Sequence, residues 1–150
     1  MKYEYQKYKL EIVREQTFES EQSYFIKNSE DIFKYLTDIC RLHKNPNEVF
    51  LAIAINAKGE IIGFTTVSVG DLCSTTTHPR EVYKFAICCN AGSVVFAHNH
   101  PSEDPVPSDT DIQTTKRLSE AGKLLGIPVL DHLLVGNETS YISMKREDLF

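Results

Sequence analysis

The sequence lacks any apolar run long enough to cross a lipid bilayer. A membrane-spanning helix needs about 20 consecutive apolar residues, and no stretch of this 150-residue chain approaches that length. The first residues, MKYEYQKYKLEIVRE, also lack the apolar core of a secretory signal peptide. These two absences predict a cytoplasmic protein.

The sequence also lacks a paired cysteine motif. Its four cysteines, Cys40, Cys73, Cys88 and Cys89, show no C-x-x-C spacing, so a structural zinc knuckle is not expected. Cys88 and Cys89 are adjacent within an apolar helical stretch. We therefore predict reduced, mostly buried thiols at all four positions.

Positive charge is in short supply as well. Sixteen lysines and arginines face 21 aspartates and glutamates, which gives a net charge of −5. An acidic chain binds nucleic acid poorly unless its basic residues cluster. The two best clusters, Lys116 with Arg117 and Arg80 with Lys84, are small and are interpreted as solvated helix faces. Nucleic acid is therefore not an expected partner.

The chain has no internal repeat, low-complexity run or linker, and its length fits one domain, 1–150. Alternating or continuous apolar runs predict strands, and apolar residues at helical spacing predict helices. The predicted strands are 8–15, 49–55, 60–70, 93–98, 127–136 and 139–144, and the predicted helices are 28–42, 78–90 and 108–126. Helices and strands thus interleave around one sheet. The hairpins favour a mixed sheet in an α/β or α+β domain.

One segment, AHNHPSEDPVPSDTD (97–111), concentrates side chains that bind metal ions. His98 and His100 end a predicted strand two residues apart, so both imidazoles point to one face while Asn99 points away. Three prolines stiffen the loop that follows. Ser108 then occupies a helix N-cap and Asp111 the third helical position, from which its carboxylate can turn back towards the strand end.

Two histidines and one carboxylate supply three protein ligands to a Zn²⁺ ion. A four-coordinate zinc ion then keeps one position for water, as catalytic sites do and structural sites do not. Each part has a simpler interpretation alone, because S-x-x-D is also a helix capping box and an isolated H-x-H pair is more often structural. Their combination at this spacing favours the metal site, and the capping and ligand roles are compatible.

Hydrolysis by a metal-activated water also calls for a general base. Glu48 directly precedes the predicted strand 49–55, which places its carboxylate at an end of the sheet. An ordinary charge at the start of a strand is the alternative interpretation of this residue.

The pattern H-x-H-P, six residues, then S-x-x-D resembles the JAMM (MPN-plus) metalloprotease motif. It consists of His98, His100, Pro101, Ser108 and Asp111. The segments AHNHPSEDPVPSDTDIQTTKRLSEAGKLLGIPVLDHLLVG, HPREVYKFAICCNAGSVVFAHNHPS and VSVGDL resemble the RadC-like branch of that superfamily. The resemblance runs from about Glu48 to Ser143.

This resemblance implies a three-layer α/β/α domain with a mixed sheet, the cytidine-deaminase-like JAB/MPN fold, with one zinc ion. His98, His100 and Asp111 are then the metal ligands. Glu48 takes a proton from the metal-bound water, and Ser108 donates a hydrogen bond to the oxyanion of the tetrahedral intermediate. The implied reaction is hydrolysis of a peptide or isopeptide bond, with a peptide or protein such as an extended tail as substrate.

The chain departs from the family pattern in two places. Glu103 stands where RadC-like proteins usually have glycine, and glycine permits backbone angles that glutamate resists. The longer RadC proteins also carry an N-terminal helix-hairpin-helix segment, which is not expected in these 150 residues. That expectation weakens an inherited DNA-repair label.

Three further histidines call for an interpretation. Asp131 and His132 form a D-H pair on a predicted strand, which looks like a family feature, and His132 is interpreted as a structural histidine with satisfied hydrogen bonds. His43 and His78 are interpreted as surface or capping residues.

Two other functions compete with the zinc hydrolase. One is a DNA-repair or nucleic-acid-processing factor, for which salt-dependent DNA binding would be diagnostic. The other is a non-catalytic MPN-type binding module, against which the complete ligand set argues.

Overall fold

The computed structural model of the chain describes residues 1–70 and 77–150. Its centre is a five-stranded mixed sheet with the strand order β2-β1-β3-β4-β5. The strands are β1 (Val49–Ile55), β2 (Ile61–Val69), β3 (Ser93–Asn99), β4 (Val129–Val135) and β5 (Tyr141–Ser143). The helices are α1 (Ser29–Asp38), α2 (Pro79–Cys88) and α3 (Asp109–Leu125), with a short 3-10 turn, η1 (Leu42–Lys44).

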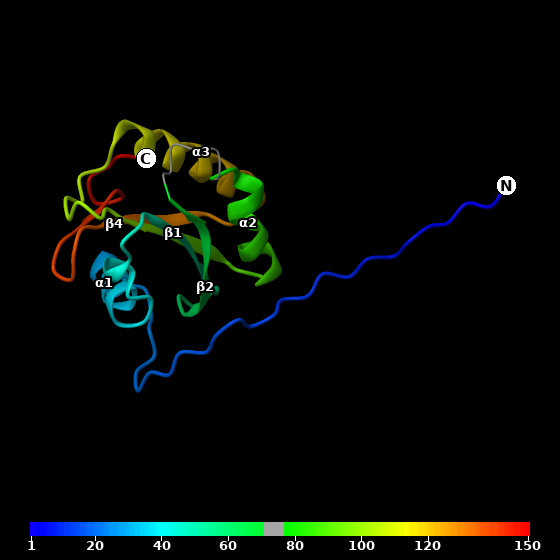
Figure 1. The fold of residues 1–150 in the computed structure, drawn as a ribbon, viewed down its shortest axis with the longest axis horizontal. Helices are drawn as coiled ribbons and strands as arrows, with labels where there is room; N and C mark the ends of the chain where they lie inside the picture. Colours follow the sequence, from blue (N-terminus) through cyan, green and yellow to red (C-terminus); the bar gives the residue numbers. More distant parts are fainter. Residues whose placement is uncertain (71–76) are drawn as a thin grey trace.

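The sheet lies between two helical layers, with α1 on one face and α2 with α3 on the other (Figure 1). Alternate residues of β1 explain this division, because successive strand side chains point to opposite faces. Phe50, Ala52 and Ala54 pack with α2 and α3, whereas Leu51, Ile53 and Ile55 pack with α1. The predicted three-layer α/β/α architecture with a mixed sheet is therefore confirmed.

Strand directions bring three chain segments to one end of the sheet. β1 runs antiparallel to β3, and β3 runs parallel to β4. The start of β1 consequently lies beside the ends of β3 and β4. The chain leaves β3 at this end and enters α3, whose first turn lies over the same edge.

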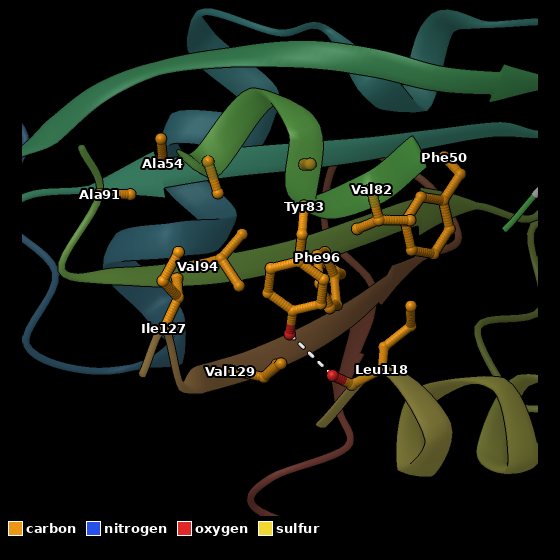
Figure 2. Packing of buried hydrophobic residues seen from close by; sticks show 12 residues of the cluster. Phe50, Ala54, Val82, Tyr83, Ala91, Val94, Phe96, Leu118, Ile127 and Val129 are labelled. Atoms are coloured by element: carbon orange, nitrogen blue, oxygen red, sulfur yellow. Dashed lines mark hydrogen bonds between the residues drawn. The ribbon is translucent and has the colours of Figure 1, made fainter. Parts of the chain in front are cut away.

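The core between the sheet and the α2–α3 layer is built around aromatic side chains (Figure 2). Tyr83 of α2 is buried, and its hydroxyl donates a hydrogen bond to the carbonyl oxygen of Leu118 in α3 at 2.7 Å. The Tyr83 ring also lies edge-on to Phe96 of β3, with 6.1 Å between centroids. These contacts fix α3, and with it the first turn that carries Asp111, against the sheet.

The prediction of a strand over residues 8–15 is wrong. These residues have no regular secondary structure, and none of the strands described in 1–70 and 77–150 pairs with them. Tyr8 and Leu10 remain 83% and 85% exposed. An alternating pattern produces a stable strand only where a neighbour supplies backbone hydrogen bonds, and no strand among the described residues supplies them to this segment.

The other predicted elements are confirmed with changes at their ends. The helix predicted over 28–42 ends at Asp38, and Arg41 adopts a left-handed backbone angle, φ +49°, that a helix cannot continue through. His78 caps α2 through its Nδ1 atom, as interpreted. His43 is half-buried rather than on the surface.

The cysteine prediction is only partly confirmed. Cys40, Cys88 and Cys89 are free thiols, but they are half-buried rather than buried. Cys88 and Cys89 lie where α2 ends, so solvent reaches part of each side chain. Cys73, together with Asp71 and Leu72 of the VSVGDL segment, lies outside the described residues. Within 1–70 and 77–150, none of the helices combines the length and hydropathy needed to cross a membrane.

Candidate metal centre

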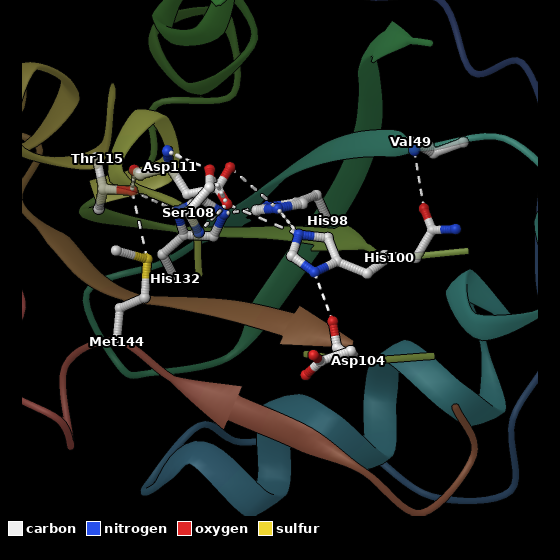
Figure 3. Close-up of polar contacts among 10 residues, drawn as sticks. Val49, His98, His100, Asp104, Ser108, Asp111, Thr115, His132 and Met144 are labelled. Carbon is white, nitrogen blue, oxygen red and sulfur yellow. Dashed lines mark hydrogen bonds and ion pairs between the residues drawn. The ribbon is translucent and has the colours of Figure 1, made fainter. Parts of the chain in front are cut away.

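The end of β3 delivers two imidazoles to one place. His98 is completely buried and His100 is partly exposed. Their Nε2 atoms lie 3.0 Å apart (Figure 3). This is the geometry that residues i and i+2 of a strand produce, so the prediction that both rings share a face is confirmed.

The first turn of α3 adds a carboxylate to the two imidazoles. Asp111 is buried, and its Oδ1 lies 3.3 Å from Nε2 of His98 while its Oδ2 lies 3.7 Å from Nε2 of His100. Ser108 caps the helix in a reciprocal capping box with Asp111. Its hydroxyl also donates a hydrogen bond to Asp111 Oδ2 at 2.7 Å. The segment is thus both a capping box and part of the cluster.

Glu48 reaches the same cluster from β1. The antiparallel register pairs Phe50 with His98, so Glu48, two residues earlier, lies opposite His100 on the same side of the sheet. Ligand atoms of Glu48, His98, His100 and Asp111 all lie within 4.8 Å of one another. The structure therefore brings together all four residues that the sequence analysis assigned to metal binding and proton transfer.

The donor set fits a small divalent cation. Three ligand atoms about 2.0–2.2 Å from a tetrahedral zinc ion would lie roughly 3.3–3.6 Å from each other. Nε2 of His98 lies 3.0 Å from Nε2 of His100 and 3.3 Å from Asp111 Oδ1, and both distances are close to that spacing. Nε2 of His100 lies 3.7 Å from the other carboxylate oxygen, Oδ2. Two ring nitrogens that face each other at 3.0 Å need either a proton or a cation between them. The cluster could therefore hold a metal ion.

A backbone contact orients the ring of His100. Its Nδ1 lies 2.7 Å from the carbonyl oxygen of Asp104 (Figure 3). A carbonyl can only accept, so Nδ1 carries a proton and donates it. The lone pair of the neutral ring is then on Nε2, which faces the cluster, and this is the tautomer that a metal ligand needs.

The charges of the cluster follow from burial and from Asp111. Burial lowers the pKa of His98, and the attraction of Asp111 only partly opposes this. The contact with Asp111, whose Oδ2 lies 3.7 Å from Nε2 of His100, raises the pKa of this less buried ring. Burial alone would raise the pKa of Asp111, but the neighbouring imidazoles of His100 and His98 and the hydrogen bond from Ser108 outweigh it and hold that pKa well below its usual range. A buried anion beside two imidazoles favours a bound cation.

Behind His98 lies a row of polar atoms inside the core. His98 Nδ1 lies 2.8 Å from Nε2 of His132, and Nδ1 of His132 lies 2.6 Å from the hydroxyl of Thr115 (Figure 3). His132 is 1% exposed, and burial holds its pKa well below the ordinary histidine value. Its interpretation as a satisfied structural histidine agrees with these two contacts.

Some of these contacts could not be anticipated. Thr115 lies one helical turn after Asp111, and this spacing places both residues on one face of α3. It is the signal in the sequence from which their proximity could have been predicted. The contact between His132 and His98 depends on the parallel pairing of β3 with β4, and no local pattern reports it. Asp131 points elsewhere, since its carboxylate accepts hydrogen bonds from the Ser143 hydroxyl and the Lys145 amide.

Comparisons with known proteins match most of the chain. A family model described as RadC-like JAB domain matches residues 26–149. A UPF0758 protein of Moorella thermoacetica is 44% identical over 124 residues, which are 83% of this chain and 53% of the relative. UPF0758 proteins of Geobacillus thermodenitrificans and Bacillus cereus are 45% and 40% identical over 83% and 86% of this chain and over 54% and 56% of their own lengths. The chain thus spans about half the length of these relatives.

Proposed function

Because the chain belongs to the RadC-like JAB domain family, we propose that it is a zinc-dependent hydrolase that cleaves a peptide or isopeptide bond. The observation that carries the proposal is the convergence of Glu48, His98, His100 and Asp111 within 4.8 Å. A cluster of two imidazoles and one carboxylate with a further carboxylate beside it matches a catalytic zinc site and its general base.

His98, His100 and Asp111 would hold the ion through two nitrogens and one oxygen. When bound, zinc acts as a Lewis acid that polarises a carbonyl and lowers the pKa of a coordinated water to about 7. The same donor types also suit iron, so the identity of the metal is part of the test.

Glu48 is the residue that we assign to proton transfer. It is half-buried and directly precedes β1, and its carboxylate lies within 4.8 Å of the ligand atoms of His98, His100 and Asp111. In this role it accepts the proton of the attacking water and returns it to the leaving amine, as a general base and then a general acid.

Ser108 would stabilise the oxyanion that develops on the substrate carbonyl. Its hydroxyl donates to Asp111 Oδ2 in the structure, so this role needs the hydroxyl to turn from Asp111 towards the substrate. A donor that points at the developing charge is worth about 10²–10³ in rate in serine hydrolases. We propose a peptide or protein substrate because the proposed reaction is hydrolysis of a peptide or isopeptide bond.

The first experiment is elemental mass spectrometry of the purified protein beside Asp111→Ala. We expect about one zinc ion per chain in the wild type and its loss in the variant. Asp109→Ala is the matched control, because Asp109 lies in the same helical turn but is exposed and outside the cluster. Iron in place of zinc would refute the metal assignment. A wild type that binds no metal after incubation with zinc would favour the binding-module alternative.

The second experiment separates metal binding from chemistry. Glu48→Gln should keep the metal, since all three proposed ligands remain, and should slow cleavage of fluorogenic peptide or isopeptide substrates by about 10²–10⁴-fold. Full activity in this variant would refute Glu48 as the base. Steeply salt-dependent DNA binding without peptide cleavage would instead support the nucleic-acid alternative.

A further inference from the structure

The contacts behind His98 form a continuous series of hydrogen bonds, which we call the relay. It runs from His98 to His132, then to the hydroxyl of Thr115, and ends on the backbone carbonyl of Asp111, which lies 2.6 Å from that hydroxyl. Its first and last members are two of the residues that would hold the metal. The proposed function assigns no role to the two members between them.

Only one arrangement of protons satisfies every contact in the relay. The Asp111 carbonyl can only accept, so the Thr115 hydroxyl donates to it. The hydroxyl oxygen then accepts from Nδ1–H of His132. Neutral His132 therefore has its lone pair on Nε2, and that atom accepts from Nδ1–H of His98. The remaining nitrogen of His98, Nε2, is left with its lone pair facing His100 and Asp111. In the metal-free protein, the proton that the 3.0 Å contact between the two Nε2 atoms requires is then carried by His100.

The reverse arrangement of protons fails at the contact between Thr115 and the Asp111 carbonyl. If Thr115 donated to His132, His132 would donate to His98, and the proton of His98 would sit on Nε2 between the ligands. The Thr115 and Asp111 oxygens would then face each other at 2.6 Å with no proton between them. Two acceptors at that distance repel each other, so the carbonyl selects the first arrangement.

The surrounding core holds the rings in the orientation that this requires. His98 and His132 are both buried. Phe50 lies parallel to the His98 ring at 6.2 Å between centroids, and edge-on to His132 at 5.3 Å. Phe96 meets His132 edge-on on another side. These aromatic neighbours restrict the rotation that would exchange the two nitrogens of either ring.

We propose that Thr115 and His132 are positioning residues that hold His98 in the Nδ1–H tautomer and so keep Nε2 ready to bind the metal. The inference rests on the proposed metal site but not on the reaction that the site performs. It also links two ligands, because the backbone of Asp111 supplies the acceptor that sets the tautomer of His98. Hydrogen-bond partners of ligating histidines commonly change metal affinity by about 10–100-fold.

The test uses the full chain and two measurements. Long-range ¹H–¹⁵N correlation spectra of the metal-free wild type report which ring nitrogen carries each proton, and we expect Nδ1–H for both His98 and His132. Competition with a chromogenic chelator then gives the zinc affinity of the wild type and the variants. Thr115→Val removes the hydroxyl at nearly the same shape and should weaken zinc binding by about tenfold or more.

Two variants separate the relay from a general packing effect. Thr115→Ser keeps the hydroxyl and should restore the wild-type tautomer and an affinity within about twofold to threefold. Thr114→Val makes the same change one residue earlier on α3, outside the relay, and should leave both readouts unchanged. A Thr115→Val protein with wild-type tautomer and affinity would overturn the proposal, and so would an Nε2–H tautomer of His98 in the metal-free wild type.

Neither measurement depends on catalysis. If the wild type binds zinc but cleaves no substrate, the tautomer and the affinity still decide the inference. If the wild type binds no metal, the spectrum of the metal-free protein decides it, since the relay predicts Nδ1–H on His98 with or without the ion.

Discussion

The side-chain oxygen of Asn99 accepts a hydrogen bond from the backbone N–H of Val49 at 2.8 Å. The amide nitrogen of the same side chain donates to the backbone carbonyls of Asn45 and Asn47 at 3.1 and 3.0 Å. Asn99 is buried and points to the face opposite the two histidines that flank it. The side chain of Asn99, which lies between His98 and His100 in the sequence, therefore holds the segment that carries Glu48 in place.

Asn99→Asp should weaken the attachment of this segment, because it removes the two hydrogen bonds that the amide nitrogen donates, and should leave the metal ligands in place. The carboxylate keeps the acceptor for Val49 but loses both donors and faces two carbonyls, so the free energy of unfolding should fall by at least about 2 kcal/mol. Zinc affinity should stay within a few-fold, whereas hydrolysis should slow by about 10–100-fold, because Glu48 is misplaced. Urea unfolding, chelator competition and substrate cleavage measure the three quantities.

The control for that variant is Asn90→Asp, the same substitution at an exposed position. It should leave zinc affinity and hydrolysis unchanged and lower the free energy of unfolding by at most about 1 kcal/mol, because its new charge lies just after the C-terminal end of α2. If Asn99→Asp lost zinc to the same extent as Asp111→Ala, this would contradict the claim that Asn99 positions Glu48 without affecting metal binding.

Glu103 occupies a backbone conformation that favours glycine. Its φ is +65°, in the left-handed region, and this is the position at which the resemblance to RadC-like proteins leads us to expect glycine. Left-handed geometry costs a residue with a Cβ about 1–2 kcal/mol. The departure noticed in the sequence is therefore accompanied by strain in the loop that joins His100 to α3.

Glu103→Gly should consequently be more stable than Glu103→Ala by about 1 kcal/mol, although both remove the same carboxylate. At Glu138, in an exposed turn without positive φ, the order should reverse, because glycine there only adds freedom to the unfolded chain. Thermal or urea unfolding of the four variants provides the comparison. Equal stability of Glu103→Gly and Glu103→Ala would show that the loop carries no such strain.

Two glycines of α3 should respond to alanine for different reasons. A Cβ on Gly122 would lie 2.3 Å from the Tyr83 hydroxyl and 2.5 Å from the Ile127 carbonyl oxygen. Gly122→Ala should therefore break the Tyr83–Leu118 hydrogen bond and destabilise the fold by about 2–3 kcal/mol or more. Gly126, the C-cap residue, has open space but a φ of +72°, so Gly126→Ala should cost only about 1–2 kcal/mol. Urea unfolding of both variants tests the order, and a larger loss in Gly126→Ala would contradict it.

The elements of the sheet could be predicted because their apolar patterns are local. The all-buried strands β1 and β3 are continuous apolar runs, and α3 begins at a capping serine and ends at a glycine. The segment 8–15 shows the limit of the same reasoning. Its alternation is as regular as that of a strand, but pairing depends on a partner elsewhere in the chain, which a local pattern does not reveal.

The residues of the candidate site could be predicted from the sequence where they follow from local patterns. His98, His100 and Asp111 lie within fourteen residues, so one strand end and one helix start determine their meeting. Glu48 joins them through the register of β1 with β3. Its position before a buried strand makes it a candidate, and the resemblance to a family favours it over an ordinary charge at the start of a strand. The contacts that fix the site, from Asn99 to Asn45 and from His132 to His98, cross between strands and required the structure.

Asp131 offers a last test, through the dependence of stability on pH. This side chain is 5% exposed, and burial raises its pKa, although hydrogen bonds from the Ser143 hydroxyl and the Lys145 and His132 amides oppose the rise. In the unfolded chain its pKa returns to the ordinary value of about 3.9. Between these two pKa values the folded state binds more protons than the unfolded state, so this group lowers the free energy of unfolding as pH increases.

Asp131→Asn removes that titration and keeps an acceptor for the two amides and a donor for Ser143. The free energy of unfolding of the variant minus that of the wild type should therefore increase as pH is raised from about 4 through the folded-state pKa. Urea unfolding of both proteins at several pH values between 4 and 7 measures this difference, in which the contributions of all other groups cancel. A difference that stays constant would mean that Asp131 titrates alike in both states. A difference that decreases would mean that the hydrogen bonds to the carboxylate outweigh its burial and hold it ionised in the folded protein.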